Sequence, residues 1–442
     1  MRLGKLAKLA SGQRDTLHSG MSSLALRLGG LVSTFGLGVV LARALGPAEY
    51  GVYGLVISVA ALAMTFALLG TPQLAVRELS VRSARGDWPG VKWLIRRFGL
   101  AVAGASLLIG AAAITLGLAL APPSQHLPII LGAMLTPATA ITMLCAAQLR
   151  GLGAMVRGQV MDILGRPAAA FLIILALVLA GSPLRATDAL WVQVAVAAAA
   201  ASISVTWVVR LLPAGTKPVS AISNAPWLAA AIPLGLVDLM RQVDGTYGVI
   251  LMGWFASAED LGIYRVALSC MMVVAMPINI LHIIQAPAIS RHHSFGETEQ
   301  LQHMLSATSA WMVAAVAPIT LAAWLIGKPA IVLVFGAAYA DAWLPLFILC
   351  ASQLAFGLFG MGPILLAMCG GERHLIRIYA IAVGLGIVAA IPMVRLAGAS
   401  GAAAAMIIST GLTGLLSWRY GKTVLGVDST FLPLLRRSAR HQ

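Results

Sequence analysis

The run FGLAVAGASLLIGAAAITLGLAL, residues 98–120, contains no charged side chain. An α-helix rises 1.5 Å per residue, so about 20 apolar residues cross the ~30 Å hydrocarbon core of a bilayer. A transmembrane β-strand would show ~10-residue segments of alternating polarity instead. Runs like this one recur along the chain, and the sequence therefore predicts an all-α polytopic membrane protein.

The overall composition supports this prediction. Hydrophobic residues make up 60% of the 442 residues and charged residues only 10%, whereas a soluble domain carries about 25% charged residues. So few charges cannot cover a surface exposed to water. We expect about twelve transmembrane helices, at residues 21–41, 51–70, 98–120, 128–149, 167–182, 189–211, 227–256, 262–288, 308–326, 343–368, 375–394 and 398–418.

The positions of the basic residues predict the orientation of these helices. Of the 30 Lys and Arg residues, only Arg43, Arg185, Lys328 and Arg395 fall in loops on one side. Apart from Arg27, Arg241 and Arg265, which lie within predicted spans, the others fall in loops or at span ends on the opposite side, which the positive-inside rule assigns to the cytoplasm. We therefore expect both termini in the cytoplasm. The net charge of +15 needs no nucleic-acid partner, because topology explains it.

An internal repeat predicts how the helices are organised. The segment EYGVYGLVIS, residues 49–58, recurs 211 residues later as DLGIYRVALS, residues 260–269, with acid, glycine, tyrosine and serine in register. Six predicted spans separate the copies, so the two halves share one orientation, and such parallel repeats place a substrate between two bundles. The predicted domains are a six-helix bundle at 1–212, a cytoplasmic linker at 213–224, a second six-helix bundle at 225–418 and a basic tail at 419–442.

The seventh span carries the most unusual charges. Asp238, Arg241 and Asp244 are spaced by three residues, and Tyr247 continues the row. Charges at membrane depth cost roughly 2.5–3.5 kcal/mol each on insertion scales and commonly mark substrate or ion pathways. Arg241 suits a phosphate group, while Asp238 or Asp244 would bind and release a proton or sodium ion. The alternative is an internal salt-bridged triad that only packs the bundles.

Other candidate residues each have a structural alternative. Arg27 in the first span is a second cationic substrate contact or a side chain that reaches the interface. Arg77 and Glu78 form a gate at the cytoplasmic mouth or a surface ion pair. Arg265 is an interfacial anchor or a site residue, and His282 titrates near neutral pH or is a structural histidine.

No catalytic motif accompanies these charges. The chain has no phosphate-binding glycine loop, nucleophile elbow or HExxH sequence, and its histidine and acidic residues match no metal-ligand spacing. The four cysteines lie in or beside apolar spans without a CxxC pair. We expect no enzyme, no metal and no cofactor. The cationic segment at 77–97 predicts an interfacial helix.

Several motifs resemble one family of transporters, the Wzx-like polysaccharide and O-antigen flippases of the multidrug/oligosaccharidyl-lipid/polysaccharide exporter superfamily. The matching segments are LARALGPAEYGVY at 41–53, GTPQLAVREL at 70–79, LRGLG at 149–153, FGAAY at 335–339 and GASGAA at 398–403. Together they are spread over nearly the whole chain.

This resemblance implies two six-helix bundles around a central cavity in the bacterial inner membrane. It implies that the substrate is an undecaprenyl-diphosphate-linked oligosaccharide for O-antigen, capsule or exopolysaccharide, and that a proton or sodium gradient drives its translocation. Membrane lipids and the polymerase and chain-length proteins of the same pathway are the implied partners. The alternative is a cation-coupled multidrug or small-molecule antiporter; many carry an acid in the first span, where this chain has Arg27. Lipid II flippases usually have two more spans.

Overall fold

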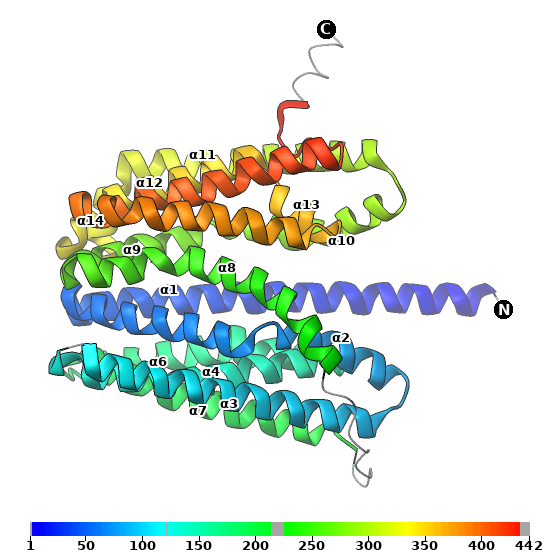
Figure 1. The fold of residues 1–442 in the computed structure, drawn as a ribbon, viewed down its shortest axis with the longest axis horizontal. Helices are drawn as coiled ribbons and strands as arrows, with labels where there is room; N and C mark the ends of the chain where they lie inside the picture. Colours follow the sequence, from blue (N-terminus) through cyan, green and yellow to red (C-terminus); the bar gives the residue numbers. More distant parts are fainter. Residues whose placement is uncertain (1, 121, 214–224, 434–442) are drawn as a thin grey trace. The chain divides into compact units, whose positions relative to one another are not determined.

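The computed structural model describes residues 2–120, 122–213 and 225–433, and all regular structure within these ranges is helical (Figure 1). Many large apolar side chains lie on the outside of these helices. Leu108 is 73% exposed, Leu333 is 77% exposed and Leu396 is 86% exposed. Water would disfavour such a surface, whereas lipid tails solvate it. The chain is therefore an all-α polytopic membrane protein, as the apolar runs predicted.

Within each half of the chain, the helices follow one another with short connections. The first half contains α1 (Arg2–Leu68), α2 (Thr71–Ala84), α3 (Trp88–Leu120), η1 (Pro123–Gln125), α4 (His126–Gly151), α5 (Arg157–Gln159), η2 (Val160–Gly165), α6 (Arg166–Leu179) and α7 (Ala186–Arg210). The second half contains α8 (Ala225–Phe255), α9 (Ala258–Val274), α10 (Met276–Ser294), α11 (Thr298–Phe335), η3 (Ala337–Ala342), α12 (Trp343–Phe359), α13 (Gly362–Met368) and α14 (Glu372–Val424).

The number of candidate spans differs from the predicted twelve. Among the described residues, 8 helices are long and apolar enough to cross a membrane, or 9 if α9 and α10, bent by 43°, form one span. The difference arises mainly because α1 and α14 each contain two predicted spans. Gly46, with φ of 74°, interrupts α1, and Gly398, with φ of 50°, interrupts α14. Glycine suits both breaks because it adopts positive φ without steric cost.

The chain divides into two compact units. Unit 1 comprises Met1–Ala44 and Ala63–Gly235, and unit 2 comprises Leu45–Leu62 and Leu236–Gln442. Residues 45–62, which contain the first copy of the internal repeat, thus belong with the later part of the chain. The predicted domain limits at 212 and 225 follow the order of spans instead and stay a prediction; residues 214–224 of the predicted linker lie outside the described residues.

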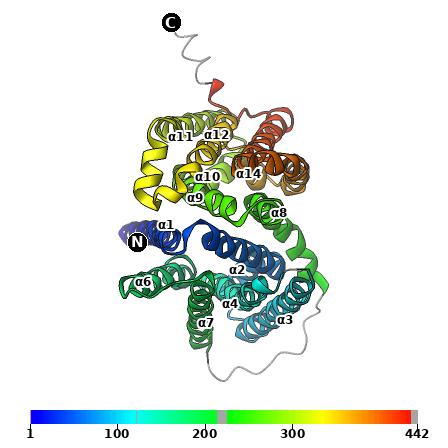
Figure 2. The ribbon, with the colours of Figure 1, turned by 90° about the vertical axis from the view of Figure 1, so that its left-hand side faces the viewer.

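Unit 1 is built around α4, which packs against α2, α3 and α7 (Figure 2). Its main core cluster includes Leu79 of α2, Phe98 of α3 and Leu144 of α4, all fully or almost fully buried. The predicted interfacial helix at 77–97 is wrong. A turn at residues 85–87 ends α2, and residues 88–97 form the first turns of the long helix α3. Their apolar side chains pack into this core instead of lying along a membrane surface.

Unit 2 has its core among α8, α12, α13 and α14. Figures 1 and 2 show α11, α12 and α14 side by side. One buried cluster joins Tyr247 of α8, Leu366 of α13 and Tyr379 of α14. This cluster matters for function because α8 also carries the charges of the seventh predicted span.

The two copies of the internal repeat pack against each other within unit 2. A Cβ atom added to Gly51 would collide with the backbone carbonyl of Ala258, and one added to Gly262 would collide with the carbonyl of Pro47. The contact is reciprocal, since Gly51 and Gly262 are equivalent positions, as are Pro47 and Ala258. The small residues let the two backbones approach closely, as in other membrane helix pairs.

Polar contacts extend this packing. Arg265 donates from Nη1 to Ser58 Oγ at 3.2 Å, and the hydroxyls of Tyr50 and Ser269 lie 3.3 Å apart. The stem of Arg265 runs across Gly54, whose added Cβ would lie 2.6 Å from Arg265 Nε. Glycine at position 54 therefore makes room for the arginine that replaces it in the second copy.

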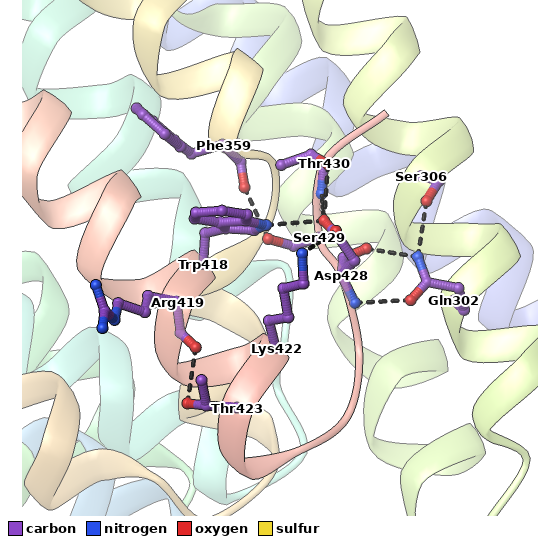
Figure 3. A network of polar contacts seen from close by, with 10 residues as sticks. All are labelled: Gln302, Ser306, Phe359, Trp418, Arg419, Lys422, Thr423, Asp428, Ser429 and Thr430. Atoms are coloured by element: carbon purple, nitrogen blue, oxygen red, sulfur yellow. Dashed lines mark hydrogen bonds and ion pairs between the residues drawn. The ribbon is translucent and has the colours of Figure 1, made fainter. Parts of the chain in front are cut away.

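The segment after α14 returns across the end of unit 2 (Figure 3). We call residues 426–430 the C-terminal strap. The side chain of Gln302, at the start of α11, donates to the carbonyl of Asp428 at 2.6 Å and accepts from its amide at 2.7 Å. Ser429 donates to the carbonyl of Phe359 at 2.7 Å. The strap thus joins the first turns of α11 to the last turn of α12.

The Asp428 carboxylate holds the strap to α14. Its Oδ1 accepts from Trp418 Nε1 at 2.8 Å and from the amide and hydroxyl of Thr430 at 3.0 and 2.7 Å. Lys422 Nζ lies 3.6 Å from its Oδ2. Partial burial raises the pKa of Asp428, but the hydrogen bonds from Thr430 and Trp418 and the charge of Lys422 outweigh it, so the net pKa is lowered.

Candidate functional site

The charged residues of the seventh predicted span lie on α8 in unit 2. Arg241 is exposed, and Asp238 and Asp244 are half-buried. Residues three apart on a helix are neighbours on its surface, so the three charges follow one side of α8. One oxygen of Asp244, Oδ1, is nevertheless buried and accepts no hydrogen bond. This side of α8 combines an accessible cation with a partly shielded carboxylate.

Other helices of unit 2 bring polar side chains to Arg241. His282 of α10 and Tyr379 of α14 both lie close enough to interact with Arg241 electrostatically. The Nε2 atom of His282 is buried without a hydrogen-bond partner, and its ring stands edge-on to Phe356 with centroids 6.0 Å apart. The structure therefore brings together two candidates predicted from the sequence, His282 and Arg241.

A second group of polar side chains lies around Asp244. The hydroxyls of Tyr247 and Ser409 are 3.3 Å apart, and Ser409 also lies next to Asp244. Tyr247 is only 4% exposed. A Cβ atom added to Gly386 would lie 2.8 Å from Ser409 Cβ and 3.1 Å from the Tyr247 hydroxyl oxygen, so the two helical segments of α14 pack tightly beside the Tyr247 hydroxyl. Tyr247 is therefore enclosed in unit 2 by its neighbours.

We name Arg241, Asp244, Tyr247, His282, Tyr379 and Ser409 the α8 cluster. Tyr379 and Ser409 were not among the residues predicted from sequence. Both lie on α14, more than a hundred residues from α8 along the chain. Tyrosine and serine are common within membrane bundles, so only the polar nature of each residue within an apolar span could have suggested them.

The remaining candidates in these regions make structural contacts. Arg77 Nη2 lies 3.4 Å from Glu78 Oε1, and Glu78 also approaches Arg82 at 3.9 Å. Ion pairs at the protein surface contribute about 0–1 kcal/mol. Arg265 bonds Ser58 and packs on Gly54, as described above. These contacts favour the structural alternative for both groups, although their roles as gate or site residues stay predictions.

Arg27 lies in unit 1, on α1, and its side chain is exposed. Arg27 interacts electrostatically with Arg150, at the end of α4. Arg27 thus belongs to a different set of neighbours from the α8 cluster.

The fold and the α8 cluster define a class of protein. A helical membrane protein with ionisable groups held inside a bundle is typical of secondary transporters. Comparison with solved structures agrees in fold. The chain is similar to an inward-facing multidrug resistance transporter of the MATE family in the MOP superfamily, with a TM-score of 0.73, 12% identity and coverage of 92% of this chain and 98% of the other.

Two further solved structures share this fold. The lipid II flippase MurJ in an inward closed conformation matches with a TM-score of 0.71 and 13% identity, over 92% of this chain and 88% of MurJ. The Vibrio cholerae MATE transporter VcmN in its bent form matches with a TM-score of 0.60 and 13% identity, over 93% of this chain and 98% of VcmN. No curated protein matches the chain significantly in sequence.

The sequence family is nevertheless clear. Residues 20–293 match the model of the polysaccharide biosynthesis protein family. The chain belongs to this family of transporters, and it is not an enzyme. The predicted resemblance to a polysaccharide biosynthesis family is confirmed, and the fold is shared with the MATE transporters and MurJ.

Proposed function

We propose that this protein is a flippase that moves undecaprenyl-diphosphate-linked oligosaccharide units from the cytoplasmic to the periplasmic leaflet of the bacterial inner membrane. The product would serve O-antigen, capsule or exopolysaccharide synthesis. Family membership supports the pathway, and the fold shared with MurJ supports a lipid-linked substrate. The observation that carries the proposal is that α8 carries an exposed arginine, Arg241, and a half-buried acid, Asp244, three residues apart on one side of the helix.

In this proposal, each charged residue on this side of α8 has a role. Arg241 binds the diphosphate, because a guanidinium donates two parallel hydrogen bonds to phosphate oxygens. Asp244, next to Ser409, binds the coupling proton or sodium ion, and Asp238 assists on the same side of α8. When Arg241 turns to a phosphate, the carboxylates lose a neighbouring positive charge and their proton affinity rises. Substrate binding and ion binding are coupled in this way.

The proposed topology has twelve spans in two six-helix bundles, with both termini in the cytoplasm. The two predicted spans within α1, the two within α14 and the bent pair α9/α10 agree with this arrangement. The distribution of basic residues supports its orientation. Movement between inward-open and outward-open forms then exposes the substrate site to each leaflet in turn.

The second candidate function is a cation-coupled antiporter of drugs or other small molecules. The fold match to MATE transporters favours it. The sequence family and the presence of Arg27, with no acid in the first predicted span, favour an anionic substrate instead.

Deletion of the gene followed by complementation tests the proposal. The flippase function predicts that undecaprenyl-linked glycan accumulates in the deletion strain and that the wild-type gene reverses this. Arg241→Ala at normal protein level should fail to reverse it, while Arg185→Ala, which removes an exposed arginine at the start of α7, should succeed. Drug sensitivity of the deletion strain without glycan accumulation would support the antiporter.

A further inference from the structure

A second cationic cluster lies in unit 1, on segments that are far apart in the sequence. Arg27 of α1 and Arg150 in the last turn of α4 are electrostatic neighbours, and we assign Arg166, the first residue of α6, to the same cluster from its spacing to Asp162. One acid, Asp162 of η2, lies among them. Arg150 has both Asp162 and Arg27 as electrostatic neighbours, although no ion pair within 4.0 Å joins Arg150 to Asp162 in the described part of the chain.

Glycines bring α1 against the segment that carries Asp162. A Cβ atom on Gly30 would collide with the carbonyl oxygen of Ile163, and one on Gly36 would lie 3.0 Å from the ring of Phe171. From Gly30 to Gly36 along α1, the contacted residue changes from Ile163 to Phe171, so residue numbers increase in the same direction on both sides of the contact. The helix α1 therefore runs parallel to η2 and α6. Arg27 lies three residues before Gly30, almost one helical turn, and is therefore level with the start of η2.

Arg150 reaches the same segment from α4. A Cβ atom on Gly158 would lie 2.6 Å from the carbonyl of Ala146 and 2.9 Å from Arg150 Cγ. Gly158, Asp162 and Arg166 are spaced by four residues, which places them on one side of the segment. The side that faces Arg150 at Gly158 therefore also carries Asp162 and Arg166.

Several buried polar atoms in this region have no partner. The Nε atoms of Arg150 and Arg166 and the Oε1 atom of Gln159 are buried and form no hydrogen bond. Buried donors are normally satisfied, and each exception calls for an explanation. The neighbouring residues 160–165 form a π-helix, a local distortion often found at functional sites. Three cations, one acid and two unsatisfied guanidinium donors are together well suited to an anionic ligand.

We propose that Arg27, Arg150 and Arg166 form a binding site for a lipid-attached phosphate or diphosphate, at which the substrate first contacts the protein. This inference rests on the proposed function and its topology, which puts the start of α1 and the end of α4 at the cytoplasmic leaflet. Phosphate oxygens would satisfy the two unpartnered Nε donors. In the empty site, Asp162 offsets the repulsion between the arginines, and it competes with the phosphate for them.

Lipid binding by purified variants in phosphatidylcholine nanodiscs tests this site, with undecaprenyl diphosphate as the probe. Arg150→Gln and Arg166→Gln should each weaken binding about tenfold, because each removes a charged hydrogen-bond donor to the phosphate. Asp162→Asn should strengthen binding severalfold. Arg157→Gln is the matched control: it removes an exposed arginine of α5 in the same segment, and binding should stay within twofold of wild type.

The response of Asp162→Asn separates a binding site from a structural ion pair. If the cluster only stabilises unit 1, Asp162→Asn lowers the thermal transition and does not tighten binding, which would overturn the proposal. If the arginine variants do not fold, the binding affinity of Asp162→Asn still tests the proposed site. Wild-type binding by Arg150→Gln and Arg166→Gln would overturn this site alone. A wild-type protein that does not bind the probe would contradict the proposed function too.

Competition distinguishes the sources of the phosphate. Undecaprenyl monophosphate and inorganic pyrophosphate should compete with the probe, because the site recognises the phosphate group. Phosphatidylglycerol at the same concentration should compete at least tenfold less. Equal competition by phosphatidylglycerol would show a site for bulk anionic lipid and would contradict a substrate site.

Discussion

A Cβ atom on Gly51 would lie 3.0 Å from the amide nitrogen of Gly262, so the two copies of the internal repeat touch at their equivalent glycines. In the same contact, Gly51 faces the carbonyl of Ala258 and Gly262 faces the carbonyl of Pro47. A local two-fold relation between residues 47–58 and 258–269 explains why both copies keep glycine at this position. It also explains why residues 45–62 belong to unit 2.

We predict that Gly262→Ala destabilises the protein by about 1–3 kcal/mol, because the added methyl group overpacks a backbone contact. The apparent melting temperature in detergent should fall by several degrees. Gly384→Ala is the control, since its Cβ would meet no atom within 4 Å and alanine favours a helix by about 1 kcal/mol. Equal melting temperatures for the two variants would argue against a tight crossing at Gly262.

We predict that substitution of Arg265 lowers stability, whereas substitution of Arg241 weakens substrate binding. Arg265→Ala removes the hydrogen bond to Ser58 and the packing on Gly54, so it should lower stability by about 1–2 kcal/mol and leave the affinity for undecaprenyl diphosphate unchanged. Arg241→Ala should reduce that affinity tenfold or more with little effect on melting temperature. The reverse pattern would show that Arg241 is structural.

We predict that Asp244→Asn uncouples transport from the ion gradient. The variant keeps the shape of the side chain next to Ser409 and Tyr247 but cannot bind and release a proton or sodium ion. Undecaprenyl diphosphate should still bind, whereas an imposed gradient should no longer accelerate its translocation in proteoliposomes. Ser204→Ala, a buried serine of α7 outside the α8 cluster, should respond to the gradient like wild type.

We predict a pH-dependent release of the C-terminal strap. The folded state lowers the pKa of Asp428 below its ordinary value of 3.8, so its stabilising contribution is present above about pH 4 and is lost as the pH falls through the lowered pKa. Hydrogen exchange of residues 425–433, corrected for intrinsic rates, should be slow at pH 7 and accelerate below pH 4. Asp428→Ala should exchange rapidly at all pH values. A pH-independent rate in the wild type would contradict this role of Asp428.

The membrane fold could be predicted because its signals are local. A run such as residues 98–120 shows by its own length and lack of charge that it can cross a membrane. The interfacial helix at 77–97 was wrong because the spacing of Val91 and Phe98 suits either a membrane surface or a protein core. Only packing against Leu144 decides between them.

The candidate sites were predictable only in part. The spacing of Asp238, Arg241 and Asp244 is visible on one helix, whereas Tyr379 and Ser409 join them through contacts across the bundle. Local periodicity contains no information on which helices meet. For the same reason, the sequence identified Arg27 as a candidate but did not associate it with the distant Arg150 and Arg166.

The most direct measurement of the proposed function is translocation by the purified protein. Proteoliposomes that contain the protein and a fluorescent undecaprenyl-diphosphate-linked oligosaccharide should move the lipid between leaflets, and Arg241→Ala should move it at least tenfold more slowly. Leaflet exposure is followed by a quencher that cannot cross the membrane. Translocation at the rate of protein-free liposomes, with the protein folded and an ion gradient imposed, would contradict the proposal that this transporter is a flippase of lipid-linked oligosaccharides.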